Sequence, residues 1–351
     1  MKKTLALVFV LAGLALAGGV SLNGAGATFP YPLYAKYFSV YHKLTGVRVN
    51  YQSIGSGGGI RQLFAQTVHF GASDAPLTDE KIAEFEQKFG TQVIHVPTAL
   101  GAVVPSYNLP GVTQPLNFSG PVLADIFLGK IKKWNDPALA ELNPGVRLPA
   151  LPITVVHRSD GSGTTYIWTE YLAKVSPEWK ERVGAGKSVA WPTGLGGKGN
   201  EGVAGLVRQV PGAIGYTELV YAVQNKIPYG AVQNRSGKFV LADLASVRAA
   251  AALEDFPADT RVSLTDTPAP DGYPIASFTW ILVFRDLDKD KAVKSRAEAE
   301  ALARLLDWIL HDGQQYNEAL HYAALPEVAV KASEANLATL RYRGEPLLGA
   351  E

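Results

Sequence analysis

The sequence predicts an α/β fold whose sheets contain mostly parallel strands. Segments rich in β-branched residues at 93–104, 153–157 and 275–284 have the composition of buried strands. Amphipathic helical patterns, such as those at 31–44 and 297–310, alternate with the strand-like segments along the chain. Because parallel strands need crossover connections, which are usually helices, this alternation indicates parallel pairing.

The length and composition indicate two globular units. The chain has 351 residues, of which 47% are hydrophobic. That is enough for a core in each of two domains of about 100–200 residues. No low-complexity linker separates two halves of the sequence. We therefore expect domains that share closely packed crossover segments rather than a flexible tether.

Residues 1–17 have the pattern of a cleaved signal peptide. A basic start is followed by an apolar run at 5–16 and by a small-x-small cleavage site at 15–17. The run is shorter than the roughly 20 apolar residues of a membrane-spanning helix. We expect an exported, soluble protein in the periplasm. Since the chain has no cysteine, we expect no lipid anchor on an N-terminal Cys.

Charge and cysteine content exclude several classes of function. The chain has 33 Lys plus Arg and 32 Asp plus Glu, so removal of Lys2 and Lys3 leaves 31 against 32, a net charge of −1. A non-specific nucleic-acid binder needs a surplus of basic residues, which this chain lacks. Without cysteine there can be no disulfide, thiolate nucleophile or iron–sulfur cluster. The histidines show no metal-ligand spacing, so we expect neither a metal nor a cofactor.

Three turns rich in glycine or hydroxyl residues each join a strand to a helix. They lie at 28–29, 56–59 and 162–164. The first backbone N–H groups of a helix lack partners and lie at the positive end of its dipole, so each turn can bind an anion. A Ser, Thr or Asn at such a place is more often a simple N-cap, and we assign that role to Thr78 and Asn200.

The strongest signal is the seven-residue segment 158–164. It combines the guanidinium of Arg158, the hydroxyls of Ser162 and Thr164, and glycine amides at the end of a predicted strand, where ligands of open α/β sheets bind. We expect Arg158 to pair with Asp160, which would hold the guanidinium toward a ligand. The alternative is an ordinary surface ion pair.

These motifs, taken in order, resemble the phosphate-binding protein of bacterial phosphate ABC importers. The matching segments are 24–30, 54–59, 70–77, 128–134, 158–164, 194–199 and 211–216, which extend over nearly all of the mature chain. The resemblance implies a type II periplasmic binding protein, in which a ligand cleft lies between two α/β lobes joined by two crossovers. We place lobe 1 at 18–106 plus 277–351 and lobe 2 at 107–276.

Carried onto this sequence, the resemblance implies a phosphate site built from both lobes. The phosphate-binding residues would be Thr28, Phe29, Ser56, Asp74, Arg158, Ser162, Gly163 and Thr164, with Asp160 behind Arg158. His69 and Gly57 depart from the family pattern at the rim of the site. The resemblance also implies a membrane permease as partner. We expect a monomer without catalytic activity.

A carboxylate in an anion site is explained by the proton of the ligand. HPO₄²⁻ and H₂PO₄⁻ can donate a proton to Asp74, whereas SO₄²⁻ cannot. A buried acceptor left unpaired costs about 1–3 kcal/mol, so Asp74 would select phosphate over sulfate. Arsenate carries the same proton and is not excluded in this way.

Two alternatives remain open at this point. The same fold can be adapted to another oxyanion, such as sulfate, molybdate or arsenate. An exported phosphohydrolase would use the same anion cradle but would need a nucleophile or a metal-activated water. The sequence contains no Gly-x-Ser-x-Gly elbow, and the glycine-rich loop at 194–199 lacks the Gly-Lys-Ser/Thr end of a P-loop.

Overall fold

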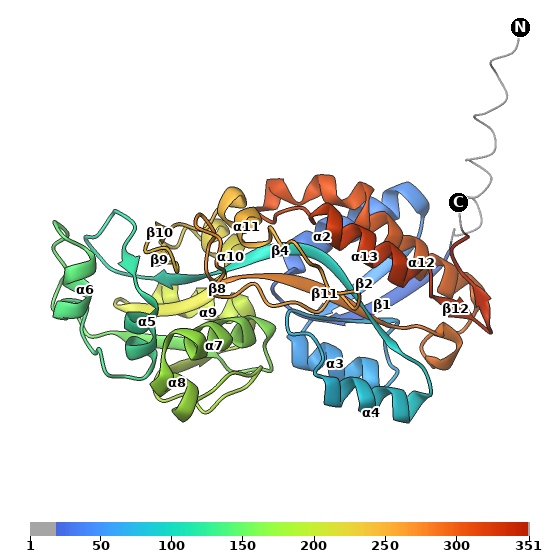
Figure 1. Ribbon diagram of the computed structural model, residues 1–351, viewed down its shortest axis with the longest axis horizontal. Coiled ribbons are helices and arrows are strands. Elements are labelled where there is room, and N and C mark those ends of the chain that lie inside the picture. The colour runs from blue at the N-terminus through green and yellow to red at the C-terminus, as the bar shows by residue number, and fades with distance from the viewer. Residues whose placement is uncertain (1–18, 350–351) are drawn as a thin grey trace, which may run out of the picture.

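A mixed eight-stranded sheet with helices on both faces runs the length of the molecule (Figure 1). The computed structural model describes residues 19–349, and the predicted signal peptide lies outside this range. The strands of the large sheet are β1 (Ser21–Gly26), β2 (Arg48–Ser53), β3 (Phe70–Ser73), β4 (Val93–Tyr107), β6 (Thr154–Arg158), β7 (Leu195–Gly197), β8 (Ala213–Glu218) and β11 (Ala276–Phe284). Two small sheets contain β5 (Asn117–Phe118), β9 (Ala231–Gln233) and β10 (Phe239–Val240), and β12 (Arg341–Tyr342) and β13 (Glu345–Pro346).

The helices lie between and beside these strands. They are α2 (Tyr31–Thr45), α3 (Ser56–Phe64), α4 (Asp79–Phe89), α5 (Gly120–Phe127), α6 (Pro137–Leu142), α7 (Gly163–Val175), α8 (Pro177–Arg182), α9 (Gly199–Gln209), α10 (Leu219–Gln224), α11 (Leu244–Ala250), α12 (Arg296–Leu310) and α13 (Glu327–Leu337). Short 3₁₀ helices occur at η1 (Leu287–Lys289), η2 (Asp312–Tyr316) and η3 (Glu318–Leu320). Among residues 19–349, no helix is both long and apolar enough to cross a bilayer.

Strand pairing differs between the outer and the central parts of the large sheet. The strand order is β2-β1-β3-β11-β4-β8-β6-β7. The outer pairs are parallel, as the alternation of elements predicts, whereas β11 is antiparallel to both β3 and β4, and β4 is antiparallel to β8. The central strands run in opposite directions because β4 carries the chain from one end of the sheet toward the other and β11 carries it back.

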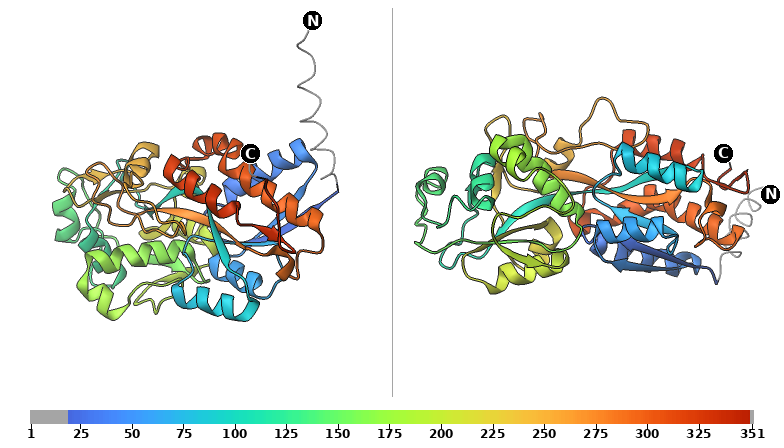
Figure 2. Two further views of the ribbon diagram at one scale, coloured as in Figure 1. Left: turned by 45° about the vertical axis from the view of Figure 1, so that its right-hand side comes forward. Right: turned by 90° about the horizontal axis from the view of Figure 1, so that it is seen from below.

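The molecule therefore has two α/β lobes (Figures 1 and 2). Lobe 1 contains β1, β2, β3 and β11 with α2, α3, α4, α12 and α13, and lobe 2 contains β6, β7 and β8 with α5 to α9. Strand β4 belongs to both lobes, because it pairs with β11 within 93–102 and with β8 over 103–107. Every residue of β4 and β11 is buried. Strands covered on both faces read as continuous apolar runs, which is why the sequence reveals these two clearly.

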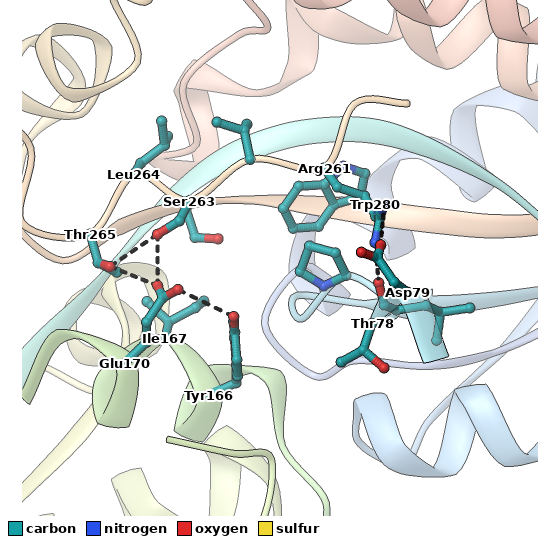
Figure 3. Close-up of a pocket in the computed structure, with 14 residues that line it drawn as sticks. Thr78, Asp79, Tyr166, Ile167, Glu170, Arg261, Ser263, Leu264, Thr265 and Trp280 are labelled. Atoms are coloured by element: carbon teal, nitrogen blue, oxygen red, sulfur yellow. Dashed lines mark hydrogen bonds and ion pairs between the residues drawn. The ribbon is translucent and has the colours of Figure 1, made fainter. Parts of the chain in front are cut away.

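A third segment, residues 259–265, also contacts both lobes. On the lobe 1 side, Arg261 donates to the carbonyl of Leu77 and forms an ion pair with Asp79. On the lobe 2 side, Ser263 and Thr265 donate to the carboxylate of Glu170 in α7 (Figure 3). A cavity of about 310 Å³ lies between these two sets of contacts. The segment therefore connects the lobes through side chains in addition to the backbone crossovers.

Helix α3 begins earlier than the sequence pattern predicts. The apolar periodicity indicates a helix at 60–67, but the glycine run at 57–59 is already helical. This run allows α3 to pack directly on the backbone of β1, since a Cβ atom on Gly59 would lie 2.4 Å from the carbonyl oxygen of Ala25. The glycines thus bring the first turn of α3 to the end of the sheet.

Replacing Gly59 by Ala should destabilise the fold. The added methyl group has no space next to β1 and should lower the free energy of unfolding by about 1–3 kcal/mol. Gly205→Ala in α9 is the matched control, because nothing lies within 4 Å of the Cβ position there. The control should gain about 0.5–1 kcal/mol from helix propensity. Urea unfolding of both variants tests this, and equal effects at the two positions would contradict the close packing of α3.

Candidate functional site

The eight residues predicted as ligands come together between the lobes, where strands end and helices begin. Thr28 and Phe29 precede α2, Ser56 opens α3, and Asp74 follows β3. The other four residues lie at the end of β6 and the start of α7. All eight are buried, namely Thr28, Phe29, Ser56, Asp74, Arg158, Ser162, Gly163 and Thr164. Their convergence creates a cluster of hydroxyl and amide donors with one cation and one carboxyl group.

Lobe 1 and lobe 2 are in direct contact through this cluster. The Gly163 N–H group at the start of α7 donates to Ser56 Oγ at 3.1 Å. One residue farther along α3, the Gly57 N–H group donates to the carbonyl of Gly161 at 3.0 Å. The backbones approach closely here, with 3.2 Å from the Cβ position of Gly161 to the Cα atom of Gly57. The two glycines therefore permit the lobes to close around the cluster.

The hydroxyl groups of the cluster are arranged as donors. Ser56 Oγ accepts the N–H groups of Asp74 and Gly163, and Thr28 Oγ1 accepts both the backbone and the side-chain N–H groups of Asn200. Each hydroxyl oxygen is thus engaged as an acceptor, which leaves its own proton as the donor. The Ser56 hydroxyl directs this proton at Asp74 Oδ2 over a long 3.5 Å contact. Protons presented in this way complement a ligand that carries acceptor oxygens, such as an oxyanion.

The other lobe presents the same arrangement. Thr164 Oγ1 accepts from Arg158 at 3.4 Å and from Asn200 at 3.1 Å. Ser162 is the N-cap of α7, and its Oγ atom accepts the N–H group of Thr165 at 2.9 Å. Among the residues that the structure describes, the backbone N–H groups of Phe29 and Thr164 have no hydrogen-bond acceptor. These amides lie ahead of α2 and in the first turn of α7, at the positive ends of the helix dipoles.

Asn200 has a different place from the one that the sequence indicates. The N-cap of α9 is Lys198, so the N-cap prediction for Asn200 is wrong. Its side chain instead connects Thr28 of lobe 1 with Thr164 of lobe 2. These partners are 172 and 36 residues away in sequence, so no local pattern identifies the role. By contrast, the N-cap predicted at Thr78 is confirmed, because its hydroxyl accepts the N–H group of Lys81.

The expected pairing of Arg158 with Asp160 is confirmed. The guanidinium donates Nε–H to Asp160 Oδ1 at 2.7 Å and Nη2–H to Oδ2 at 2.6 Å, and Arg158 is only 3% exposed. Asp160 also accepts the N–H group of Gly199 at the start of α9. Burial opposes ionisation of Asp160, but the bonds and the charge of Arg158 outweigh it and lower the pKa of this carboxyl.

Asp74 titrates close to neutral pH. Burial raises the pKa of its carboxyl from 3.8 to about 7, although the Thr279 hydroxyl, the Arg158 charge and Ser56 act in the opposite direction. The Thr279 hydroxyl donates to Oδ1 at 2.7 Å, and Ser56 Oγ lies 3.5 Å from Oδ2. A carboxyl in this state can accept a proton from an acidic ligand at little cost.

A second buried carboxyl lies behind the cluster and was not found from the sequence. Glu218, at the end of β8, donates its backbone N–H to Asn200 Oδ1, and its Oε2 atom accepts the N–H group of Val220. Burial raises the pKa of Glu218 well above its ordinary value. A neutral Glu218 adds no negative charge beside the anion-binding groups. Within residues 19–349, no group of three His, Asp or Glu side chains is arranged to hold a metal ion.

Comparison with known proteins agrees with this arrangement. The family model described as "PBP superfamily domain" matches residues 15–312. The phosphate-binding protein PstS of Pasteurella multocida is 48% identical over 322 residues, which cover 91% of this chain and 90% of that protein. PstS of Haemophilus influenzae is 46% identical over 329 residues and covers 93% of this chain and 95% of that protein.

A solved structure shows the same fold at low sequence identity. A high-affinity periplasmic phosphate-binding protein, PfluDING, determined with bound phosphate, superposes with a TM-score of 0.72 at 20% identity. The match covers 94% of this chain and 100% of the other. The fold and the family model place the chain in the class of two-lobed periplasmic binding proteins. Within that class it belongs to the family of phosphate-binding proteins PstS.

Replacing Asp74 by Asn should change how stability depends on pH. Because the folded-state pKa is raised to about 7, the ionised carboxylate opposes folding. The free energy of unfolding of the unmodified protein, relative to that of Asp74→Asn, is therefore highest below pH 3.8. It falls as the pH rises through 7, by at most about 4 kcal/mol. Urea unfolding without phosphate at pH 4 and pH 8 measures this change. Asp312→Asn at an exposed position is the control, and a pH-independent difference for Asp74→Asn would contradict the raised pKa.

Proposed function

We propose that this protein is a periplasmic receptor that captures inorganic phosphate between its lobes and delivers it to the permease of an ABC importer. The observation that carries the proposal is the buried set of hydroxyl and amide donors from both lobes, arranged around one carboxyl with a pKa of about 7. Relatives at 48% and 46% identity that are named phosphate-binding proteins support it.

The proposed phosphate contacts divide into donors and one acceptor. The donors are the hydroxyls of Thr28, Ser56, Ser162 and Thr164, the amides of Phe29, Gly163 and Thr164, and the guanidinium of Arg158, with Asp160 orienting Arg158 from behind. Asp74 is the acceptor and receives the proton of HPO₄²⁻ or H₂PO₄⁻. Charge-assisted hydrogen bonds of about 1.5–3 kcal/mol each allow tight binding without a metal or a cofactor.

Binding is coupled to closure of the two lobes. We place lobe 1 at 18–106 plus 277–351 and lobe 2 at 107–276. The change of the β4 pairing partner between residues 102 and 103 and the start of β11 at residue 276 support these boundaries. Phosphate contacts both lobes and therefore favours the closed state by the difference between its affinities for the two states.

The protein acts as a carrier and does not catalyse a reaction. Among the described residues, no histidine is hydrogen-bonded to Ser56 or Ser162. The carboxyl that contacts Ser56 belongs to Asp74, to which we assign the proton of the ligand rather than that of a serine nucleophile. We further propose that the protein is a monomer with no affinity for nucleic acid. Its signal peptide would direct export to the periplasm and be cleaved at about residue 17. No separate observation favours either alternative, namely binding of another oxyanion or activity as a phosphohydrolase.

Titration calorimetry with phosphate and with sulfate tests the ligand. Sulfate leaves Asp74 unpaired, at a cost of about 1–3 kcal/mol, so phosphate should bind more tightly by a factor between about 5 and 150. In Asp74→Asn the amide can donate to sulfate, and the preference should shrink or reverse. Equal affinity of the unmodified protein for both anions would exclude the role of Asp74, and absence of phosphate binding would exclude the proposed function.

Asn200→Ala tests the side-chain bridge between the lobes. The variant keeps the backbone N–H bond to Thr28 but loses the side-chain amide that donates to the hydroxyls of Thr28 and Thr164. Phosphate affinity should therefore fall about tenfold. Asn108→Ala is the matched control, because its amide bonds to the carbonyl of Arg208 near the other end of α9. An unchanged dissociation constant in Asn200→Ala would show that the hydroxyls are oriented without this amide.

A further inference from the structure

A basic pocket of about 580 Å³ opens beside the proposed phosphate site. Both lobes line it: Arg61, Lys81 and Lys88 come from α3 and α4, and Lys187 comes from the segment between α8 and β7. Glu84 is the one carboxylate in its lining. Four positive charges less one negative charge leave a formal surplus of +3, in a mature chain whose side chains sum to −1 by the sequence count. The positive charge is therefore a local concentration.

Three of these cations have no ion-pair partner among the described residues, and only Lys81 has one. Glu84 pairs with Lys81 at 2.5 Å. Within the part of the chain that the structure describes, no carboxylate pairs with Arg61, Lys88 or Lys187. Lys88 donates only to the carbonyl of Phe64. Lys187 is half-buried, and burial together with the nearby charge of Lys81 lowers the pKa of its ammonium group. Like charges held this close, without neutralisation, are typical of a surface that receives an anion.

The pocket adjoins the phosphate site on both lobes. Gly57 lines the pocket, and the preceding residue, Ser56, belongs to the site. On the opposite lobe, the carbonyl of Lys187 accepts the N–H group of Ser162 at 2.9 Å. The contact between Gly57 and Gly161 therefore separates the pocket from the site when the lobes are together. An anion in the pocket is next to the site once that contact opens.

From this placement we infer that the basic pocket is an outer anion site, which captures phosphate at the mouth of the cleft before the lobes close. The inference rests on the proposed function. The rest of the lining includes the apolar side chains of Ile60, Phe64 and Leu77, which offer phosphate no hydrogen bond. Apart from the hydroxyl of Thr78, phosphate is held there by cationic side chains, of which Arg61, Lys81 and Lys88 are exposed to solvent. The site is therefore weak and releases its ligand to the fixed donors inside.

The outer site should increase the association rate and leave the dissociation rate unchanged. Charges that line a cleft raise the local concentration of an oppositely charged ligand, and salt screens the effect. In the double variant R61Q/K187Q, the association rate of phosphate should fall about fivefold at 20 mM salt and less than about twofold at 0.5 M salt. Stopped-flow measurement of intrinsic tryptophan fluorescence gives both rates on the full mature chain.

Two further variants make the measurement specific. K43Q/K291Q removes the same charge from exposed positions on α2 and near η1 and should leave the association rate almost unchanged. Glu84→Gln removes the carboxylate of the pocket and should raise the rate. This second expectation does not depend on the stability of the double variant.

The possible outcomes separate the two proposals. An association rate in R61Q/K187Q equal to that of the unmodified protein, or a loss of rate shared with K43Q/K291Q, overturns the outer site while phosphate binding itself stands. A faster dissociation with unchanged association also overturns it, because the cations would then hold the closed lobes together. Failure of the unmodified protein to bind phosphate at all would instead reject the proposed function.

Discussion

The buried guanidinium of Arg158 sets the constraint on which the rest of the cleft depends. An ion removed from water in this way is stable only if its charge and all its N–H groups find partners. Asp160 supplies a bidentate partner, and the Gly199 amide at the start of α9 holds Asp160 in turn. Because Asp160 neutralises Arg158, the pair adds little net charge. The charge of a bound anion must then be balanced largely by hydroxyls, amides and helix dipoles.

These hydroxyl groups can act as donors because hydrogen bonds to neighbouring residues hold them in place. Ser56 and Thr28 accept hydrogen bonds from neighbouring N–H groups, which fix the positions of their oxygen atoms. The Asn200 side chain does this for hydroxyls on both lobes. Donors that are already oriented lose little entropy when a ligand arrives. Asp74 is the exception in this set, since its ionised form can only accept. In the proposed function, its raised pKa makes the protonation of the ligand part of recognition.

Closure of the lobes depends on the segments that connect them and on the surfaces that meet when they close. Strand β4 continues from lobe 1 into lobe 2, and the segment 259–265 adds side-chain contacts to both lobes. The closing surfaces meet at Gly57 and Gly161, where side chains would keep the backbones apart. The inner site is overall close to electroneutral, whereas the basic pocket outside it is not. In the proposed function, the cations of the basic pocket set the association rate, and the residues of the inner site set the selectivity for the anion.

Much of the fold could be predicted from the sequence, because local chemistry carries it. The buried strands β4 and β11 are continuous apolar runs, and the helices follow amphipathic patterns with recognisable starts. The antiparallel centre of the sheet could not be predicted, since it depends on the direction in which a strand crosses between lobes. The helical glycines of α3 have no apolar periodicity, and only the close approach to β1 explains them.

The site divides in the same way. The sequence by itself determined the residue types at three strand-to-helix turns and the pairing of Arg158 with Asp160, because each lies within a few consecutive residues. The tertiary structure alone decided that Asn200 bridges the lobes, that Asp74 has a pKa of about 7 and that four cations from two lobes share one pocket. Burial, hydrogen-bond partners and charge density depend on residues far apart in the chain, and only folding brings them together.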